Sequence, residues 1–157
     1  MHVREAAATD TPAIRRVAER AWRADYPAAL DGDTIEAGVN HWYGDPVVKT
    51  ELQTPHTEFL VAERDGEVEG FVHAHVGAEP TILRLHVRPA ARDGSITEAL
   101  FEAVLDAVED PDRLRGTVLE ANDTMLSFYL ERGFERVGTE RTTIDGTTYP
   151  EAVLERA

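Results

Sequence analysis

The segment from Val87 to Glu98 has residue types and a spacing that could bind a phosphate group. The alternating apolar run before it predicts a strand with one buried face, formed by Leu83, Leu85 and Val87. Pro89 ends this run, and after a short polar loop Ser95 and Glu98 form a capping-box pattern that predicts a helix start. At such a junction, free backbone N–H groups and the positive end of the helix dipole point the same way, so the spacing predicts an anion site.

Two histidines could instead bind a metal ion, because His73 and His75 lie two residues apart on one face of a predicted strand. The sequence shows no evident third ligand, so we expect no metal site. It also contains no cysteine, which excludes a disulfide, a thiolate nucleophile and a cysteine-based metal site.

The charge balance limits the partners of this 157-residue chain. Thirty Asp and Glu residues oppose 16 Lys and Arg residues, so the formal net charge is −14. Such a surface repels nucleic acid and anionic lipid, and we expect neither as a partner. No apolar run approaches the ~20 residues of a membrane span, and the N-terminal residues lack the apolar core of a signal peptide. We expect a cytoplasmic location, and the excess of carboxylates over lysines favours a salt-accumulating source over an acidic mesophile.

The elements that must position the anion site follow from periodicity. Apolar residues at helical spacing predict helices through residues 14–22, over 31–43, from 95 to 108 and from 122 to 130. We expect residues 44–57 to be irregular, because they contain Pro46 and Pro55. Strand patterns cover residues 2–6, 58–63, 67–76, 115–120, 134–144 and 147–155 in addition to the strand before Pro89, and Asp-Gly pairs predict hairpins at 65–66 and 145–146. The order β-α-α-β-β-β-α-β-α-β-β predicts an α/β layered domain with a mixed sheet.

Two stretches resemble motifs of the GCN5-related N-acetyltransferase (GNAT) family. The strand ending in Val87-Arg88-Pro89, then Arg92, a short loop and a helix starting near Ile96, resembles the family's acetyl-CoA motif. The stretch from Asn122 to Phe134 resembles its pattern of Asn, seven residues to Tyr, then Gly-Phe. The element order fits nearly the whole chain. The resemblance implies one GNAT-like domain over residues 1–157, with a mixed, mostly antiparallel central sheet flanked by helices. It also implies transfer of an acetyl group from acetyl-CoA to a primary amine of a small molecule or peptide.

The resemblance also implies roles, position by position. Backbone groups at residues 85–87 would bind the pantetheine arm, and N–H groups of residues 92–97 would hold the diphosphate. Asn122 would bond the pantetheine or the neighbouring backbone, and Tyr129 would lie beside the thioester sulfur. The implied cofactor-binding set is Leu85, His86, Val87, Arg92, Asp93, Gly94, Ser95, Ile96, Thr97, Glu98, Asn122 and Tyr129.

These residue types suit direct acyl transfer to an amine. Backbone N–H groups can stabilise the oxyanion, and the phenol of Tyr129, with an ordinary pKa of about 10, is close enough to a thiol to act as general acid. The amine must also lose a proton, and the candidate bases are His86, His73, His75 and Glu120. We place His86 first, because alternation puts it on the sheet face opposite Leu85 and Val87, where an acceptor would lie.

The loop departs from the family pattern, which reads Arg or Gln, two residues, Gly, one residue, then Gly or Ala. Ser95 and Thr97 occupy the positions of small residues, and Asp93 adds a negative charge beside an anion. Either change is expected to weaken anion binding by about 1 kcal/mol or more. The hydroxyl of Ser95 and the flexibility of Gly94 would compensate. This departure motivates a second reading, a catalytically weak module that binds an acyl-CoA or a partner protein.

Several residues also have purely structural interpretations. Tyr129, next to Phe128, suits core packing, and Asn122 suits a plain helix N-cap. Four aromatic residues of the N-terminal region suit either the core or an acceptor pocket: Trp22, Tyr26, Trp42 and Tyr43. Arg84, Arg88 and Arg115 suit solvent-exposed positions or ion pairs. The sequence does not name the acceptor, and a homodimer is one possible assembly.

Overall fold

A computed structural model of the chain describes residues 1–26 and 30–156. Within these residues seven strands form one sheet in the order β1-β2-β3-β4-β5-β7-β6. Neighbouring strands are antiparallel except β4 and β5, which are parallel. The strands are β1 (His2–Glu5), β2 (Thr57–Arg64), β3 (Glu67–His75), β4 (Thr81–Val87), β5 (Arg115–Leu119), β6 (Phe134–Ile144) and β7 (Thr147–Arg156).

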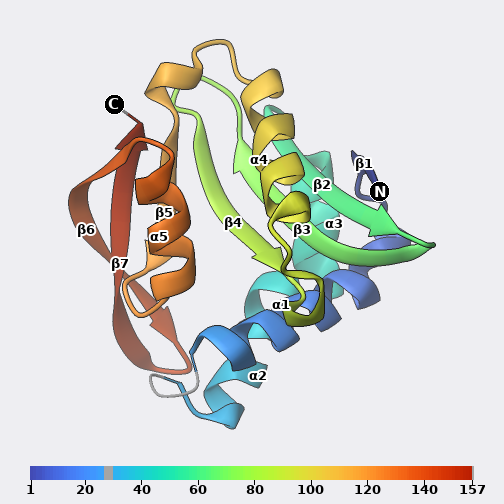
Figure 1. Ribbon diagram of the computed structural model, residues 1–157. Helices are drawn as coiled ribbons and strands as arrows, with labels where there is room; N and C mark the ends of the chain where they lie inside the picture. The colour runs from blue at the N-terminus through green and yellow to red at the C-terminus, as the bar shows by residue number, and fades with distance from the viewer. Residues whose placement is uncertain (27–29, 157) are drawn as a thin grey trace.

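Helices cover both faces of the sheet (Figure 1). One face carries α1 (Thr11–Asp25), α2 (Gly32–Tyr43) and α3 (Asp45–Gln53), and the other carries α4 (Ser95–Ala107) and α5 (Asp123–Glu131). Short 3-10 helices lie at Ala8–Asp10, Pro89–Ala91 and Pro111–Arg113. The predicted α/β order and the mixed, mostly antiparallel sheet are therefore confirmed. None of the described helices combines the length and the apolarity that a transmembrane segment needs.

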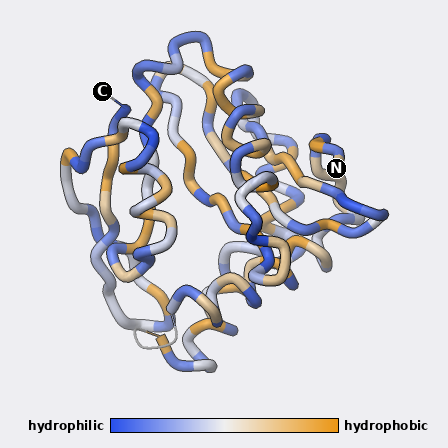
Figure 2. The backbone as a smooth tube through the Cα atoms, in the orientation of Figure 1, coloured by the Kyte–Doolittle hydropathy of each residue, from blue (hydrophilic) through white to orange (hydrophobic). Residues whose placement is uncertain are grey.

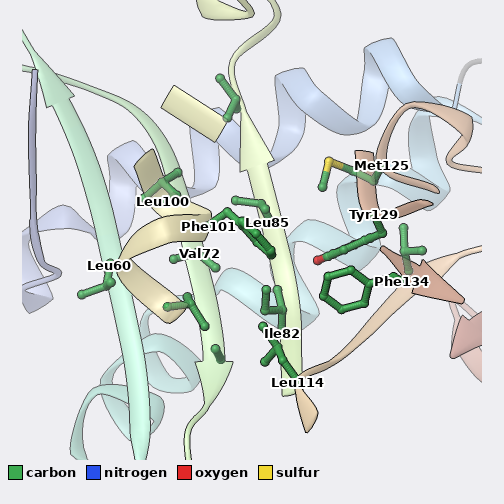
Figure 3. Packing of buried hydrophobic residues seen from close by; sticks show 14 of the residues in the cluster. Leu60, Val72, Ile82, Leu85, Leu100, Phe101, Leu114, Met125, Tyr129 and Phe134 are labelled. Carbon is green, nitrogen blue, oxygen red and sulfur yellow. The ribbon is translucent and has the colours of Figure 1, made fainter. Parts of the chain in front are cut away.

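Each sheet face has its own apolar cluster, and the hydropathy of the chain follows this layering (Figure 2). Beneath α4 and α5 the first cluster includes Leu60, Val72, Ile82, Leu85, Leu100 and Phe101 (Figure 3). Beneath α1, α2 and α3 the second cluster includes Ile14, Val17, Trp22, Ile35, Tyr43 and Phe71. The helical periods predicted these buried stripes, since the residues facing the sheet recur every three or four positions.

Both predicted Asp-Gly hairpins are confirmed. Asp65 and Gly66 join β2 to β3 with φ angles of 53° and 80°, and Asp145 and Gly146 join β6 to β7 with φ angles of 49° and 80°. Two consecutive residues with positive φ make the turn that matches the twist of paired strands, and Asp-Gly is among the sequences that adopt it most readily.

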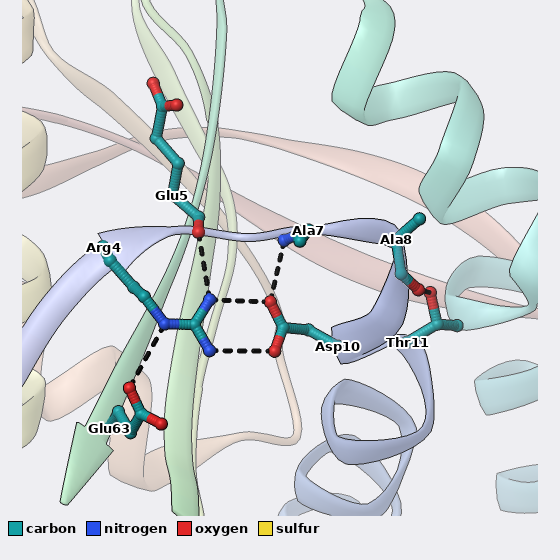
Figure 4. A network of polar contacts seen from close by, with 7 residues as sticks. All are labelled: Arg4, Glu5, Ala7, Ala8, Asp10, Thr11 and Glu63. Atoms are coloured by element: carbon teal, nitrogen blue, oxygen red, sulfur yellow. Dashed lines mark hydrogen bonds and ion pairs between the residues drawn. The ribbon is translucent and has the colours of Figure 1, made fainter. Parts of the chain in front are cut away.

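A network of ion pairs fastens the N-terminus to the sheet (Figure 4). The guanidinium of Arg4 donates to both carboxylate oxygens of Asp10, at 2.8 and 2.9 Å, and its Nε donates to Glu63 on β2 at 3.2 Å. Asp10 also accepts from the N–H of Ala7 at 2.7 Å. Its hydrogen bonds with Arg4 lower the pKa of Asp10 below its ordinary value. These contacts join β1, β2 and the start of α1.

The prediction that residues 44–57 are irregular is wrong, because they contain helix α3. Pro46 lies in the first turn of this helix, where a backbone N–H has no partner within the helix and its absence costs nothing. The helix then ends before Pro55, as expected for a residue that disfavours helical backbone in the position preceding it.

The predicted capping box at Ser95 is also wrong. The N-cap of α4 is Gly94, with φ of 94°, and Ser95 is the first helical residue. The carboxylate of Asp93 accepts from the backbone N–H of Ser95 at 2.9 Å and from its hydroxyl at 2.6 Å, so Asp93 caps the helix instead. Glu98 turns away from this end and pairs with Arg132.

The alternation predicted for β4 fails at Leu83. His73 pairs with Arg84 and Ala74 pairs with Ile82, so Leu83 is an extra residue in a β-bulge. The buried face of β4 is consequently formed by Ile82, Leu85 and Val87.

Candidate functional site

The parallel pairing of β4 with β5 stops after two residue pairs, Thr81 with Arg115 and Ile82 with Gly116. The strands then diverge (Figure 1). Two hollows lie along the divergence. A groove of about 350 Å³ lies between β4, the start of α4 and α5. A smaller cavity of about 30 Å³ lies between β4, β5 and the N-terminal helices.

The groove brings together half of the predicted cofactor-binding set. Its lining from β4 and the following loop comprises Leu85, His86, Val87, Arg92, Gly94 and Thr97. Met125, Ser127 and Phe128 of α5 line the opposite wall. Ile96, by contrast, is fully buried in the apolar core, so its side chain belongs to the first cluster.

The free edge of β4 presents backbone groups to this groove. The N–H of Arg88 donates to Glu69 on β3 at 2.8 Å. Since backbone groups alternate along a strand, those of Leu85 and Val87 point away from β3, whereas those of His86 point toward it. The carbonyl of Val87 accepts from Nε of Arg92 at 3.1 Å. Leu85 and the N–H of Val87 thus match the role that the resemblance implies, and the backbone of His86 does not.

Arg92 positions the loop with its side chain. Its guanidinium donates to both oxygens of Asp25 at the end of α1, at 2.7 and 3.1 Å. The side chain of Asp25 is only 3% exposed. A bidentate pair with one partner buried holds the loop rigidly against α1. Any contact of this loop with an anion would therefore come from its backbone.

The start of α4 has one amide already occupied. The hydroxyl and the backbone N–H of Ser95 both donate to the carboxylate of Asp93, and these two hydrogen bonds hold the pKa of Asp93 below its usual range. Arg64 lies 3.6 Å from the same carboxylate. The N–H groups of Ile96 and Thr97 belong to the first turn, where a helix provides no backbone acceptor, so they stay available to an anion. The groove, its backbone groups and this helix end together fit a diphosphate joined to a pantetheine arm.

Tyr129 is buried between the diverging strands and is 1% exposed. Its ring lies against Gly116, where a Cβ atom would come within 3.2 Å of Cε1 and Cζ. Phe134 packs edge-on to the ring, with centroids 5.0 Å apart. Figure 3 shows the hydroxyl directed toward β4. A phenol of ordinary pKa is protonated at neutral pH, and burial raises the pKa of Tyr129 further.

Asn122 is fully buried and is the N-cap of α5, as its structural interpretation predicted. Its Oδ1 accepts from the N–H of Met125 at 3.1 Å, and its Nδ2 donates to the hydroxyl of Tyr26 at 3.0 Å. This side chain therefore connects α5 to the end of α1. A contact with pantetheine stays a prediction.

His86 is buried on the α1 and α2 side of the sheet. Its Nε2 accepts from Nε1 of Trp22 at 3.3 Å, and its Nδ1 has no hydrogen-bond partner among the described residues. Burial, with smaller effects from Arg84 and Arg92, lowers the pKa of His86 to about 3. The imidazole is therefore neutral at physiological pH, with the lone pair of Nε2 directed at Trp22.

The other candidate bases lie outside both hollows. His73 bonds Glu51 of α3 at 3.1 Å, and His75 lies 3.3 Å from the hydroxyl of Thr57. Glu120 pairs with Arg136 at 2.9 Å on the surface. In residues 1–26 and 30–156 no three His, Cys, Asp or Glu side chains come together as a metal site.

Glu151 was not predicted from the sequence as a site residue. This residue of β7 lines the same small cavity as Tyr129. Burial raises the pKa of its carboxyl, with nearby Arg84 opposing the shift and Glu140 adding to it. The signal in the sequence is its place in the alternation of β7, between Tyr149 and Val153 on one strand face. A glutamate in such an apolar series marks a carboxylate directed inward.

Comparison with known proteins agrees with this architecture. Residues 31–149 match the family model described as an acetyltransferase (GNAT) domain. No curated protein matches the sequence.

Solved structures match over almost the full chain. The PaiA N-acetyltransferase from Thermoplasma acidophilum, solved in complex with coenzyme A, is 22% identical with a TM-score of 0.81, covering 99% of this chain and 97% of that one. The ribosomal-protein-S18-alanine N-acetyltransferase from Escherichia coli is 16% identical with a TM-score of 0.71, covering 99% and 92%. Apo YjaB from Escherichia coli is 19% identical with a TM-score of 0.74, covering 98% and 95%. At these identities the likeness concerns the fold.

The buried imidazole of His86 makes stability depend on pH. Its folded-state pKa lies below the value of about 6.5 expected for the unfolded chain, so the unfolded state binds the proton first as pH falls. The stabilisation is complete above that value and declines as pH falls toward about 3. Between pH 7 and 5 we expect His86 to account for a loss of about 2 kcal/mol in the free energy of unfolding.

Urea unfolding of the wild type and of His86→Gln at both pH values measures this loss. Glutamine keeps an acceptor for Trp22 but does not titrate, so the variant should lose about 2 kcal/mol less than the wild type. His2→Gln, at an exposed position, is the control. Equal losses in wild type and His86→Gln would show that this imidazole is not held neutral.

Proposed function

Because the chain belongs to the acetyltransferase (GNAT) family, it is an acetyl-CoA-dependent N-acetyltransferase, and we propose that Tyr129 and Glu151 carry out its proton transfers. The observation that supports this assignment is that the phenol of Tyr129 and the carboxyl group of Glu151, whose pKa is raised by burial, line one cavity where β4 and β5 diverge. The phenol can give a proton to a leaving group, and the carboxylate can take one from an incoming amine.

The groove is the proposed seat of the cofactor. Acetyl-CoA, when bound, supplies an acetyl group activated as a thioester. The backbone of Leu85 and Val87 would hold the pantetheine arm, much as a neighbouring strand would. The N–H groups of Gly94, Ile96 and Thr97 would hold the diphosphate, helped by the dipole of α4. This arrangement directs the thioester end toward Tyr129, because the groove and the small cavity share Leu85, His86 and Met125.

The residues then act in sequence. Glu151, as carboxylate, accepts a proton from the acceptor amine, directly or through a water molecule. The amine nitrogen would add to the acetyl carbon, which places a negative charge on the acetyl oxygen before the carbon–sulfur bond breaks. The N–H groups on the free edge of β4 stabilise the negative charge on the acetyl oxygen, and Tyr129 protonates the departing sulfur. Exchange with solvent returns the proton from Glu151 to Tyr129 and restores both groups.

We assign His86 a structural role instead of the role of base. Its engagement with Trp22 and its low pKa make it a weaker base than Glu151, and its neutral ring keeps the cavity free of a further positive charge. The acceptor is an amine, and we propose that it approaches from the side of α1 and α2, where Trp22, Tyr26 and Trp42 line the cavity.

Replacing Tyr129 by Phe tests the general acid. We expect kcat to fall by about 100-fold or more, whereas the Kd for coenzyme A should change by less than about twofold, because the ring still fills its place beside Gly116. Steady-state acetylation kinetics and calorimetry measure the two quantities. Tyr149→Phe is the matched control, since Tyr149 lies outside both hollows. Equal losses in kcat and affinity would mean that Tyr129 is a packing residue.

Replacing Glu151 by Gln tests the general base. In the wild type the rate should rise with pH as this carboxyl ionises, and its raised pKa places that rise above the usual carboxyl range. In the variant the rate should no longer show this rise with pH, and kcat should fall about 100-fold. Glu135→Gln is the control, because Glu135 is an exposed glutamate of β6 that lies outside both hollows. A profile unchanged by Glu151→Gln would remove Glu151 from the mechanism.

Replacing Asp93 by Ala tests the diphosphate seat. The change frees the N–H of Ser95 and removes a negative charge, so coenzyme A should bind roughly fivefold more tightly, which corresponds to about 1 kcal/mol. The lost cap should cost about 1 kcal/mol of stability. Calorimetry and urea unfolding measure these effects. Asp110→Ala removes a comparable cap on Asp112 away from the groove and should leave affinity unchanged. Weaker binding by Asp93→Ala would place the diphosphate elsewhere.

A further inference from the structure

Arg84 is a partly buried cation in the wall of the small cavity. It lies on β4, on the sheet face toward α1 and α2, and its Cζ is 4.6 Å from the ring centroid of Trp42. Its Nη1 donates to the carbonyl of Leu83 at 2.6 Å, and the buried hydroxyl of Tyr43 lies near the guanidinium. The guanidinium therefore stacks on an indole and keeps most of its in-plane N–H groups for another partner.

Within the described part of the chain, Arg84 has no carboxylate oxygen within 4.0 Å. Five other partly buried arginines do have such a partner, namely Arg4, Arg64, Arg88, Arg92 and Arg132, whereas Arg156 at the end of β7 has none among the described residues. Among the cations without such a partner, Arg84 is the one that lines the small cavity with Tyr129 and Glu151. Even Glu151, in the same cavity, stays beyond ion-pair distance. The guanidinium of Arg84 is therefore able to pair with a negatively charged group of a bound ligand.

A carboxylate is the group that best suits this guanidinium. The planar fork of an arginine presents parallel N–H groups that match the two oxygens of a carboxylate, and stacking on Trp42 fixes the plane of that fork. Glu151 lies in the same cavity with the opposite charge. The cavity therefore has one positive and one negative pole, which suits a ligand that carries a carboxylate near its amino group.

The space beside Trp42 accommodates the rest of such a ligand. The small cavity alone holds little more than one water-sized group. A second cavity of about 270 Å³ lies between α2 and the β6–β7 turn, lined by Gly38, His41, Ile144 and Asp145 among others. Trp42 lines both cavities, so they lie on either side of one indole, and together they offer space for a small molecule.

We propose, resting on the N-acetyltransferase function above, that Arg84 binds the carboxylate of the acceptor and that the acceptor is an amino acid or a close amino carboxylate. The amino group then faces Glu151 and Tyr129, and the side chain of the acceptor occupies the cavity beside α2. Arg84 is in this view the residue that determines specificity between amino acids and simple amines.

Matched acceptors test this assignment. Amino acids with small, acidic, basic and aromatic side chains are compared with their amides and with the corresponding amines that lack the carboxyl group. Binding is measured by calorimetry on protein saturated with coenzyme A, and acetylation is measured by release of the free thiol. At least one amino acid should bind and react about 10- to 100-fold better than its amide, as expected for a charge-assisted hydrogen-bonded pair.

Variants of Arg84 then locate the preference. Arg84→Gln should remove the preference for amino acids. Binding of the amino acid should weaken 10- to 100-fold and binding of the amide less than about threefold, with an unchanged Kd for coenzyme A. Arg84→Lys, which keeps the charge without the fork, should be intermediate. Arg113→Gln, at an exposed position, is the control for the change in net charge.

The outcomes separate the two proposals. If amides and simple amines bind and react as well as amino acids, or if Arg84→Gln weakens all of them equally, the assignment of Arg84 is overturned while the acetyltransferase function stands. If amino acids bind through Arg84 and no amine of any class is acetylated, the assignment of Arg84 stands and the proposed catalytic roles fail.

Discussion

The site depends on the point at which β4 leaves β5. A bulge at Leu83 adds a residue to β4 and increases its local twist, and parallel pairing ends directly before it, at Ile82. Beyond that point every second residue of β4, namely Leu85 and Val87, has backbone groups without a partner strand on that side. Unpaired backbone groups are costly when buried, so they stay open to a groove. The β4 strand therefore has a free inner edge beyond the bulge, and in the proposed binding mode the cofactor takes the place of a partner strand there.

The gap is kept open by side chains that are themselves fixed. Tyr129 fills the space against Gly116, where no larger residue leaves room for the ring. Asn122 caps α5 and bonds Tyr26, which joins the two walls of the small cavity. Arg92 ties the loop after β4 to Asp25. Each of these residues connects elements from different layers, so the site keeps its shape without a bound ligand.

Charged side chains are arranged differently around the groove and around the small cavity. Near the groove, partly buried arginines are paired with carboxylates and hold loops and helix ends in place, as with Arg92 and Arg132. Around the small cavity, burial favours neutral groups, which keeps Tyr129 protonated and His86 uncharged. Arg84 and Glu151 are the exceptions there. A charged pair held apart in a cavity of low polarity is costly unless a ligand of complementary charge completes it, which is the physical basis for the acceptor assignment.

The sequence alone determined the order of elements, both Asp-Gly hairpins and the two family motifs, because these follow from periodicity and from local turn chemistry. It misjudged α3, since Pro46 breaks a helix only outside the first turn, and it assigned to Ser95 the capping role that Asp93 performs. Tertiary structure alone decided the chemistry of the cavity. Burial and a hydrogen bond to Trp22 hold His86 as a neutral imidazole, while strand pairing brings Glu151, remote in sequence, into the same cavity as Tyr129. The pKa of a side chain depends on its neighbours in space, and residues from β4, α1 and β7 become neighbours only when the sheet is assembled.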